Sequence, residues 1–419
     1  MKILLFFFLA SFTIFADLYF INPMLTFGNL SLILIIYLTL IHNKVLKNQW
    51  YLLSNQDQTL QSGIIKSYLI FILYIFIVHI FRGEVLFAFK NIILQLGIIC
   101  SLLLFNYFYY EKKYDFLKYL YFFLLAHFIF VILQINNVSI VLSDLIPSNF
   151  LISSNINIDN FSNYKRVSGT IFSEIILAKQ CIFFLVVFIA YSLKDPNLSF
   201  NIKNLFFIMI TIFILFATQV RSAIFSFIPI ISMCYLYYGD HKINGKFTFL
   251  IIFFSLVIFL FSFFIDFFVQ NFPYVFKTMN LSDTHRFYTS WSVAKGTLLE
   301  SPLFGISKEL GWDIFDQYRD INYNPYVYIN PSEMDNSPTN HNQLLYYIRN
   351  YGLIGLALWI NLYFRIFKAI KLTKVNYIRF IVGSIFVLDL FFSMAHNNKI
   401  FTPLLWIILS LNFAPSRKE

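Results

Sequence analysis

A histidine and an asparagine, His341 and Asn342, lie where a polar stretch of the chain becomes apolar, in SPTNHNQLLYYIRNYGLIG (residues 337–355). Imidazole can take up a proton near neutral pH, so His341 is a candidate general base for a hydroxyl nucleophile. Asn342 could bind the same substrate. The alternative is that His341 is bonded to its own loop at the start of a helix.

Arginines occupy comparable positions elsewhere, at Arg166, Arg221 and Arg286. A guanidinium binds phosphate or diphosphate bidentately and keeps its charge. The alternatives are that Arg166 and Arg221 extend to lipid headgroups and that Arg286 is a solvated loop charge. Arg349 lies two turns beyond His341, and either lines the same cavity or pairs inside the helix bundle. We find no paired Asp or Glu suited to a divalent metal, so the arginines would neutralise a diphosphate leaving group and no cofactor is expected.

The composition defines the environment in which these side chains act. The chain is 59% hydrophobic and 21% aromatic, and only 12% of its 419 residues are charged, against roughly 25% in a soluble protein. We therefore predict an all-α polytopic membrane protein with a single integral membrane domain, residues 1–419. The three cysteines lie in apolar runs and are expected to be buried small side chains, with neither zinc spacing nor a disulfide pattern.

About twelve apolar stretches are candidates to cross a bilayer, which takes about 20 residues each. The first continues apolar to Ile21 and is interpreted as a membrane helix, not a signal peptide. The third and eleventh are short, and little more than Arg221 separates the seventh from the eighth. The expected spans are 3–21, 23–41, 67–81, 92–110, 119–142, 168–193, 204–220, 222–238, 247–269, 343–363, 378–392 and 399–413.

The basic residues predict the orientation of these spans. With both termini in the cytoplasm, the loops 42–66, 111–118, 194–203, 239–246 and 364–377 face the cytoplasm and carry most of the basic excess, as the positive-inside rule requires. The formal charge of +10 is thus a topology signal, and nucleic acid is not an expected partner.

One large loop, about residues 270–340, is predicted on the periplasmic side between the ninth and tenth spans. It is expected to be partly helical, because the stretch 286–300 has a helical pattern, and a loop of this length is usually functional or disordered. The segments that carry Arg166, Arg221 and His341 all fall at this same face. The predicted topology therefore gathers at one level polar groups that are far apart in the sequence.

Three local patterns, in this order along one polytopic chain, resemble the O-antigen polymerase and ligase superfamily (Wzy and WaaL types). RVSGTIF (166–172) resembles an Arg-x-x-Gly sequence seen mainly in polymerases, although the following SEIILAKQ (173–180) departs from the polymerase pattern. TQVRSAIFSF (218–227) resembles the family's arginine at the outer end of a span. HRFYTSWSVAKGTLLESPLFG (285–305) resembles its loop pattern of Arg, Trp and a Pro-x-x-Gly turn.

A fourth pattern comes from the opening stretch. His341-Asn342, then nine residues, Gly352, two residues and Gly355, resembles a pattern described for ligases and shared more widely. From their spacing alone, Gly352 and Gly355 are predicted to lie on one helical face, where small residues allow close helix packing.

The resemblance implies a metal-independent, inverting glycosyltransferase of the bacterial inner membrane, with its active site on the periplasmic side. Its donor and acceptor would be undecaprenyl-diphosphate-linked glycans, and membrane lipid and a chain-length regulator are further candidate partners. It implies that Arg221 and Arg286 bind the lipid diphosphate, that His341 is catalytic and that Arg166 is a second contact. The candidate sugar contacts in the loop are Trp291, Trp312 and His285.

Three functions remain open on this basis. The favoured prediction is a polymerase that joins repeat units en bloc, which RVSGTIF supports. The alternative is a ligase that transfers the glycan to lipid A-core, which the His-Asn pattern supports. A transporter or flippase would place polar groups near the midplane of the membrane. A proton-coupled carrier would also need buried carboxylates, for which Asp17, Asp266 and Asp389 are the few candidates, and Asp17 and Asp266 fall near span ends.

Overall fold

The computed structural model describes residues 27–41, 59–110, 119–135, 174–192, 202–218, 281–307, 310–318, 342–373 and 376–395, with isolated positions between 6 and 10 and between 220 and 233. Every regular element in these residues is an α-helix. Apart from the isolated positions, the spans expected over 3–21, 222–238, 247–269 and 399–413 lie outside the described residues.

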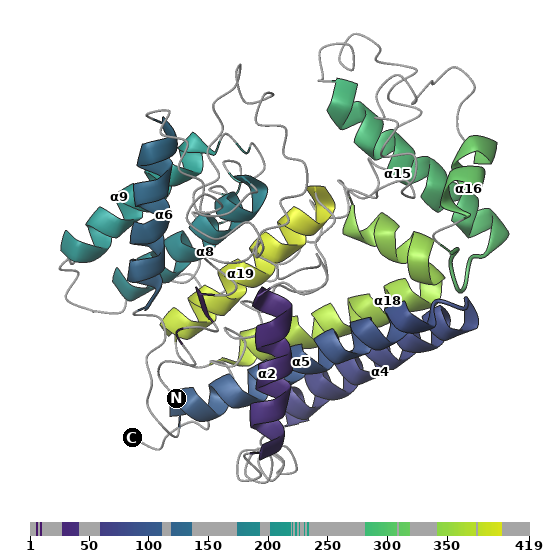
Figure 1. The fold of residues 1–419 in the computed structure, drawn as a ribbon, viewed down its shortest axis with the longest axis horizontal. Coiled ribbons are helices and arrows are strands. Elements are labelled where there is room, and N and C mark those ends of the chain that lie inside the picture. Colours follow the sequence, from purple (N-terminus) through teal and green to yellow (C-terminus); the bar gives the residue numbers. More distant parts are fainter. Residues whose placement is uncertain are drawn as a thin grey trace, which may run out of the picture.

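Two groups of helices form the apolar part of the structure (Figure 1). In the first, α4 (Thr59–Phe81) packs against both α5 (Val85–Tyr110) and α18 (Gln343–Leu372), and α2 (Phe27–Ile41) crosses α5. The second group consists of α6 (Tyr119–Ile135), α8 (Glu174–Ser192) and α9 (Ile202–Ala217). The two groups are joined by α19 (Asn376–Ala395), which contacts both α18 and α8.

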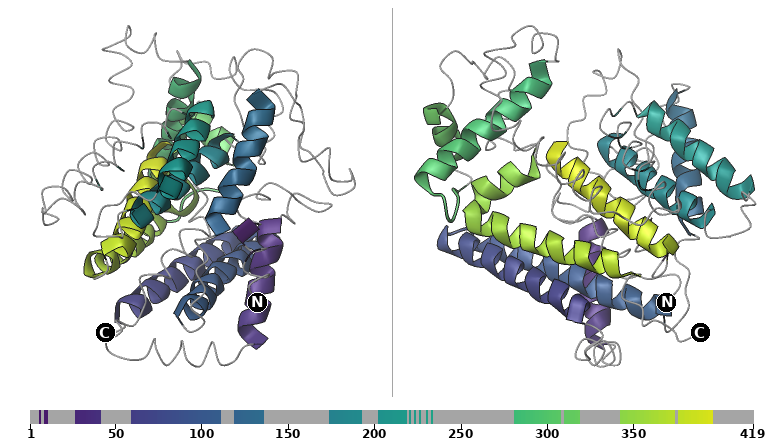
Figure 2. Two further views of the ribbon diagram at one scale, coloured as in Figure 1. Left: turned by 90° about the vertical axis from the view of Figure 1, so that its left-hand side faces the viewer. Right: turned by 180° about the vertical axis from the view of Figure 1, so that it is seen from behind.

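Two further helices come from the long segment that precedes α18. They are α15 (Leu281–Glu300) and α16 (Gly311–Tyr318), and they pack on each other. The right view in Figure 2 shows α15 beside the first part of α18, away from the second helix group. This segment therefore packs on α18, the helix that directly follows His341 and Asn342 in the sequence.

Within the described residues, four helical segments are long and apolar enough to cross a membrane, judged by length and composition: Gly63–Phe81, Val85–Phe105, Ile175–Ser192 and Gln343–Leu372. Shorter apolar helices cover Leu30–Ile41, Tyr119–Ile135 and Lys203–Ala217. This architecture agrees with the expected all-α polytopic class. The total of about twelve spans stays a prediction.

Helices α4, α5 and α18 are all longer than hydropathy predicted. The third expected span, 67–81, is preceded by helix that starts at Thr59 and includes Lys66, and α18 continues to Leu372 and includes Lys368. Helical hydrogen bonds form within the chain and do not need an apolar surface, so a helix can continue beyond its apolar part. The long stems of lysines can lie along such an end while the charge stays in water.

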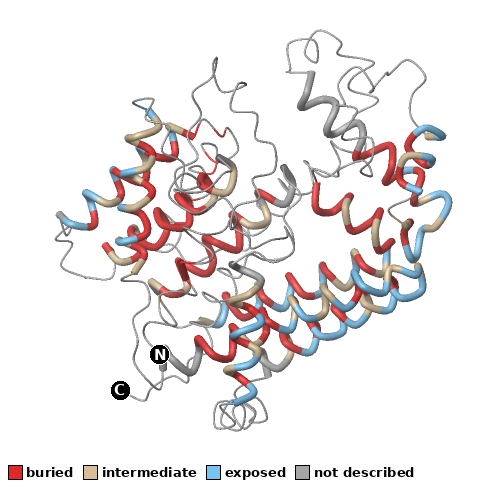
Figure 3. The backbone as a smooth tube through the Cα atoms, in the orientation of Figure 1, coloured by how far each residue is buried: buried red, intermediate tan, exposed pale blue. Residues whose placement is uncertain are grey.

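The pattern of burial separates an interior from an apolar exterior (Figure 3). α8 is buried along most of its length, with Phe184 and Phe188 almost inaccessible. On α4 and α5, by contrast, large apolar side chains such as Ile70, Leu73 and Phe89 are exposed on the outer faces. Exposed apolar faces of this kind are what a bilayer would cover.

Candidate functional site

Asn342 fixes the start of α18. Its side chain is fully buried, and its Oδ1 accepts hydrogen bonds from the backbone N–H groups of Leu344 (2.9 Å) and Leu345 (3.2 Å). The first N–H groups of a helix have no partner within the helix, and a capping side chain supplies one. Asn342 is thus a helix cap, and its predicted contact with substrate stays a prediction. His341 lies outside the described residues.

Gly352 interrupts α18. Its φ of 63° and ψ of −165° are not helical, and such a positive φ suits glycine and strains other residues. The prediction that Gly352 lies on a continuous helical face is therefore wrong. Gly355 fits the prediction of close packing, because a Cβ there would come within 3.3 Å of the Tyr74 ring on α4.

The backbone of the turn that follows α15 fills the interruption. In a continuous helix the N–H of Leu353 would donate to the carbonyl of Arg349. Here it donates to the Pro302 carbonyl at 2.8 Å, and the Arg349 carbonyl accepts from Ile306 N–H at 2.7 Å. Backbone groups freed in an apolar environment must find partners, and the Pro302–Ile306 turn supplies them.

Two glycines from distant motifs make this approach possible. Gly305 ends the Pro-x-x-Gly turn with a φ of 75°, and a Cβ on it would come within 2.7 Å of the Asn350 carbonyl carbon. A Cβ on Gly352 would come within 2.6 Å of the backbone nitrogen of Phe304. Both distances are too short for real atoms, so a side chain at either position would push the two backbones apart. The turn motif and the His-Asn-x9-Gly pattern thus meet in one structural unit.

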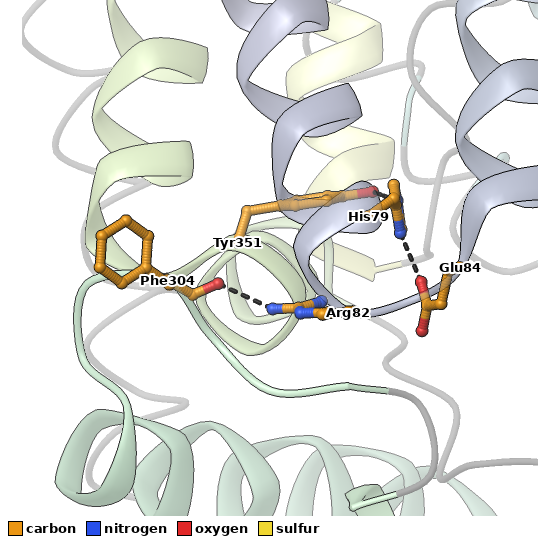
Figure 4. A network of polar contacts seen from close by, with 5 residues as sticks. All are labelled: His79, Arg82, Glu84, Phe304 and Tyr351. Atoms are coloured by element: carbon orange, nitrogen blue, oxygen red, sulfur yellow. Dashed lines mark hydrogen bonds and ion pairs between the residues drawn. The ribbon is translucent and has the colours of Figure 1, made fainter.

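The loop between α4 and α5 holds this unit from the other side (Figure 4). Gly83 (φ 76°) ends α4, with Gly83 N–H donating to Ile80 and Glu84 N–H donating to His79, the pattern of a Schellman cap. Arg82 Nη2 donates to the Phe304 carbonyl at 2.8 Å. The α4–α5 loop is therefore attached directly to the Pro302–Ile306 turn.

His79 joins the same loop to the break in α18. Its Nδ1 lies 2.5 Å from Glu84 Oε2 and its Nε2 lies 3.1 Å from the Tyr351 hydroxyl. One tautomer satisfies both contacts, with Nδ1–H donating to the carboxylate and the phenol donating to Nε2. Tyr74 of α4 also donates its hydroxyl to the Tyr351 carbonyl at 2.7 Å. The residue before Gly352 is thus bound through both its side chain and its backbone.

The described charged side chains at this junction include two arginines, Arg82 and Arg349, and one glutamate, Glu84. Arg82 is half-buried, and burial lowers the pKa of its guanidinium while the nearby Glu84 opposes that shift. Arg349 is buried on α18, close enough to Arg82 for the two positive charges to interact. Among the described side chains, Glu84 is bonded to His79 and forms no ion pair with an arginine. The structure places Arg349 at a buried position beside the break in α18. That it lines the cavity or pairs inside the bundle stays a prediction.

α15 lies against the first turns of α18. Trp291, only 8% exposed, and Ala294 form an apolar cluster with Leu345 and Ile348. Trp291 therefore attaches the helix that carries Arg286 to the helix that Asn342 caps. Its role as a sugar contact stays a prediction.

The other predicted site residues are placed only in part. Arg286 and His285 lie in the first half of α15, but their side chains are not among those described. Trp312 is half-buried in α16 and packs edge-on against Phe315, with ring centroids 5.7 Å apart. Arg166 and Arg221 lie outside the described residues, so their proximity to the junction stays a prediction.

Sequence reasoning missed the polar residues of the α4–α5 loop. A signal for them existed, because HIFRGE (79–84) places charged residues between two apolar runs, as in the segment around Arg221. The predicted topology puts this loop at the same outer level as His341. Within the described residues, no three His, Cys, Asp or Glu side chains gather as metal ligands would. Metal-independent chemistry stays a prediction.

The apolar helical spans and the broken, loop-bound helix define a helical membrane protein with a polar junction at one end. Residues 206–360 match the family model Wzy_C, described as O-antigen ligase. The match covers the positions of Arg221, Arg286 and His341, the Pro-x-x-Gly turn and the break at Gly352. It confirms the resemblance to the O-antigen polymerase and ligase superfamily, without distinguishing the Wzy from the WaaL type. A comparison with curated proteins gave no match.

Proposed function

We propose that this protein is a Wzy-type polymerase that joins undecaprenyl-diphosphate-linked repeat units into O-antigen or a related surface polysaccharide. The family match supports an O-antigen ligase- or polymerase-type enzyme. The observation that supports a site here is the packing of α15 on the first turns of α18. Arg286 belongs to α15, and α18 begins just after His341 in the sequence. The proposed phosphate-binding residue thus belongs to a helix that packs against the helix whose N-cap, Asn342, directly follows the proposed base in the sequence.

In the proposed reaction, His341 accepts the proton of the attacking hydroxyl of the acceptor glycan. The hydroxyl oxygen forms a bond to the anomeric carbon of the donor, and the bond from that carbon to the diphosphate oxygen breaks with inversion. Arg221 and Arg286 neutralise the charge on the departing diphosphate, with Arg166 as a further contact. The positive charges are in place before reaction, so no metal is required for leaving-group stabilisation.

The proposed setting is the bacterial inner membrane, with both termini in the cytoplasm and the site on the periplasmic side. The enrichment of basic residues in the predicted cytoplasmic loops supports this orientation. Lipid-linked glycans would reach the site from the bilayer, and a chain-length regulator is a candidate partner.

O-antigen ligation is the second candidate, because the matched family is described as O-antigen ligase. A ligase would use the same donor and the same leaving group, with lipid A-core as acceptor. The two functions therefore differ at the acceptor side of the site and not in the donor half.

Deletion of the gene, read by lipopolysaccharide gel, separates these candidates. A core-plus-one-repeat band is expected, because a polymerase is needed to extend the first unit. Bare core with polymer retained on the lipid carrier would mean that a ligase had been lost. An unchanged gel would contradict both functions.

Complementation of the deletion with variants of the gene then tests whether His341 is the catalytic base. His341→Ala should abolish the ladder while the protein still inserts into the membrane, and Arg365→Ala, at the opposite end of α4 and α18, is the matched control that should restore it. A normal ladder with His341→Ala would remove the catalytic role.

A further inference from the structure

Arg82 has more hydrogen-bonding capacity than its contacts use. Its Nη2 donates to the Phe304 carbonyl at 2.8 Å, whereas a guanidinium carries five N–H donors in a planar fork. No carboxylate lies within ion-pair distance of it in the described part of the chain. The nearby acid, Glu84, has its Oε2 against His79 at 2.5 Å. Arg82 thus forms no ion pair with the described residues, although Glu84 lies close enough to offset part of its charge.

The surroundings of Arg82 increase the need for an anion. The guanidinium is half-buried, where water screens its charge less than at an open surface, and the buried Arg349 lies within electrostatic range. Among the described residues, Glu84 offsets part of the charge of Arg82 and is itself bonded to His79, so the guanidinium keeps N–H donors for a further anion. The planar guanidinium can bind two oxygens of one phosphate group at once, which a monatomic anion does not allow.

The surface around Arg82 is apolar and open. Phe81 and Leu86, on either side of the loop, are each 88% exposed, and Leu303 and Phe304 of the attached turn are also exposed. A Cβ on Gly83 would meet no atom within 4 Å. A cation at the edge of an exposed apolar surface matches a molecule that carries both a phosphate and a hydrocarbon chain.

We propose that Arg82 binds the diphosphate of a second lipid-linked glycan, the acceptor, at a site separate from the one that holds the donor. This inference rests on the proposed function, in which two lipid-linked chains must be bound at once. The hydroxyl that attacks belongs to the sugar end of the acceptor, so the diphosphate of the acceptor lies one oligosaccharide away from the base.

The geometry of α18 provides such a separation. Arg82 is attached through Phe304 to the break at Gly352, and Asn342 lies at the start of the helix. About ten residues of helix separate these two points, roughly 15 Å at 1.5 Å per residue. The donor arginines, Arg221 and Arg286, would serve the diphosphate near His341, and Arg82 the distant one.

Direct binding tests this assignment without requiring turnover. The purified full-length protein, in phosphatidylcholine nanodiscs, would be titrated with labelled undecaprenyl diphosphate. We expect two equivalents to bind the wild type. Arg82→Gln keeps an N–H donor for the Phe304 carbonyl but removes the charge, and should weaken one of the two by at least about tenfold, because charge-assisted hydrogen bonds are lost.

Two further variants separate charge from structure. Arg82→Lys keeps the positive charge and should retain most of the second binding event, although the fork is lost. Arg365 is an exposed arginine of α18 beside Gly63, near the start of α4, and Arg365→Ala should bind two equivalents like the wild type. Equal binding by Arg82→Gln and the wild type would overturn the assignment, as would a single equivalent bound by the wild type.

A phospholipid headgroup is the competing source of phosphate. Displacement of the second equivalent by phosphatidylglycerol as effectively as by unlabelled undecaprenyl diphosphate would overturn the acceptor site in favour of a headgroup site. No binding of undecaprenyl diphosphate at all would contradict the proposed function itself. One equivalent that depends on Arg221 and Arg286, and not on Arg82, would contradict the second site alone.

Discussion

Substitution of Gly352 by alanine provides a sharp test of the junction between α18 and the Pro302–Ile306 turn. The backbone at Gly352 has a φ of 63° and a ψ of −165°, a region that is essentially restricted to glycine. The added methyl group would also overlap the backbone of Leu303 and Phe304. Backbone atoms cannot rotate away as a side chain can, so the turn must separate from the helix.

The expected cost follows from these two effects. The backbone conformation alone costs about 1–3 kcal/mol for a residue with a side chain. Separation of the turn breaks the Leu353–Pro302 and Ile306–Arg349 hydrogen bonds, each with a net contribution of about 1 kcal/mol. Together these give about 3–5 kcal/mol of destabilisation, a large fraction of the 5–15 kcal/mol typical of a folded domain.

The free energy of unfolding would be measured for the detergent-solubilised protein by SDS titration, followed by tryptophan fluorescence. Gly83→Ala is the matched control, because Gly83 also has a positive φ of 76° but no atom lies within 4 Å of a Cβ there. It should cost only the backbone strain, about 1–2 kcal/mol. Equal losses for the two variants would refute the close approach of the turn to Gly352.

Two further predictions concern the elements that surround this junction. Asn342→Ala should lower the free energy of unfolding by about 0.5–2 kcal/mol in the same titration, because two capped N–H groups lose their acceptor, whereas Asn342→Asp should retain most of it; equal losses would contradict the cap. Trp291→Ala should cost about 3–5 kcal/mol and make α15 sensitive to limited proteolysis, since the ring packs on α18. The half-buried Trp312→Ala should cost less, and the reverse order would contradict this packing.

The helices were largely predictable because membrane segments are a local property of the chain. An uninterrupted apolar run must satisfy its own backbone groups in lipid, and a helix does so without any distant partner. The predicted segments 119–142 and 168–193 accordingly contain α6 and α8. The helix ends were less predictable, as at Thr59, because a helix can continue once its apolar surface has ended.

The α4–α5 loop shows the limit of such reasoning. HIFRGE (79–84) contains an arginine, a histidine and a glutamate between two spans, and this pattern alone does not reveal which of them touch another element. The contacts of Arg82 with Phe304 and of His79 with Tyr351 join residues more than 200 positions apart. Only the packing of α4 against α18 brings them together.

The sequence by itself determined the helical membrane class, the resemblance to the O-antigen polymerase and ligase superfamily and the residues worth testing, because hydropathy, charge bias and short motifs are all local. The tertiary structure alone decided how two of the motifs are used. Gly305 and Gly352 resemble separate patterns in the sequence, and in the structure their backbones meet and exchange hydrogen bonds. The physical reason is that a broken helix in an apolar environment must complete its hydrogen bonds with a distant segment, and spacing along the chain does not specify which segment that is.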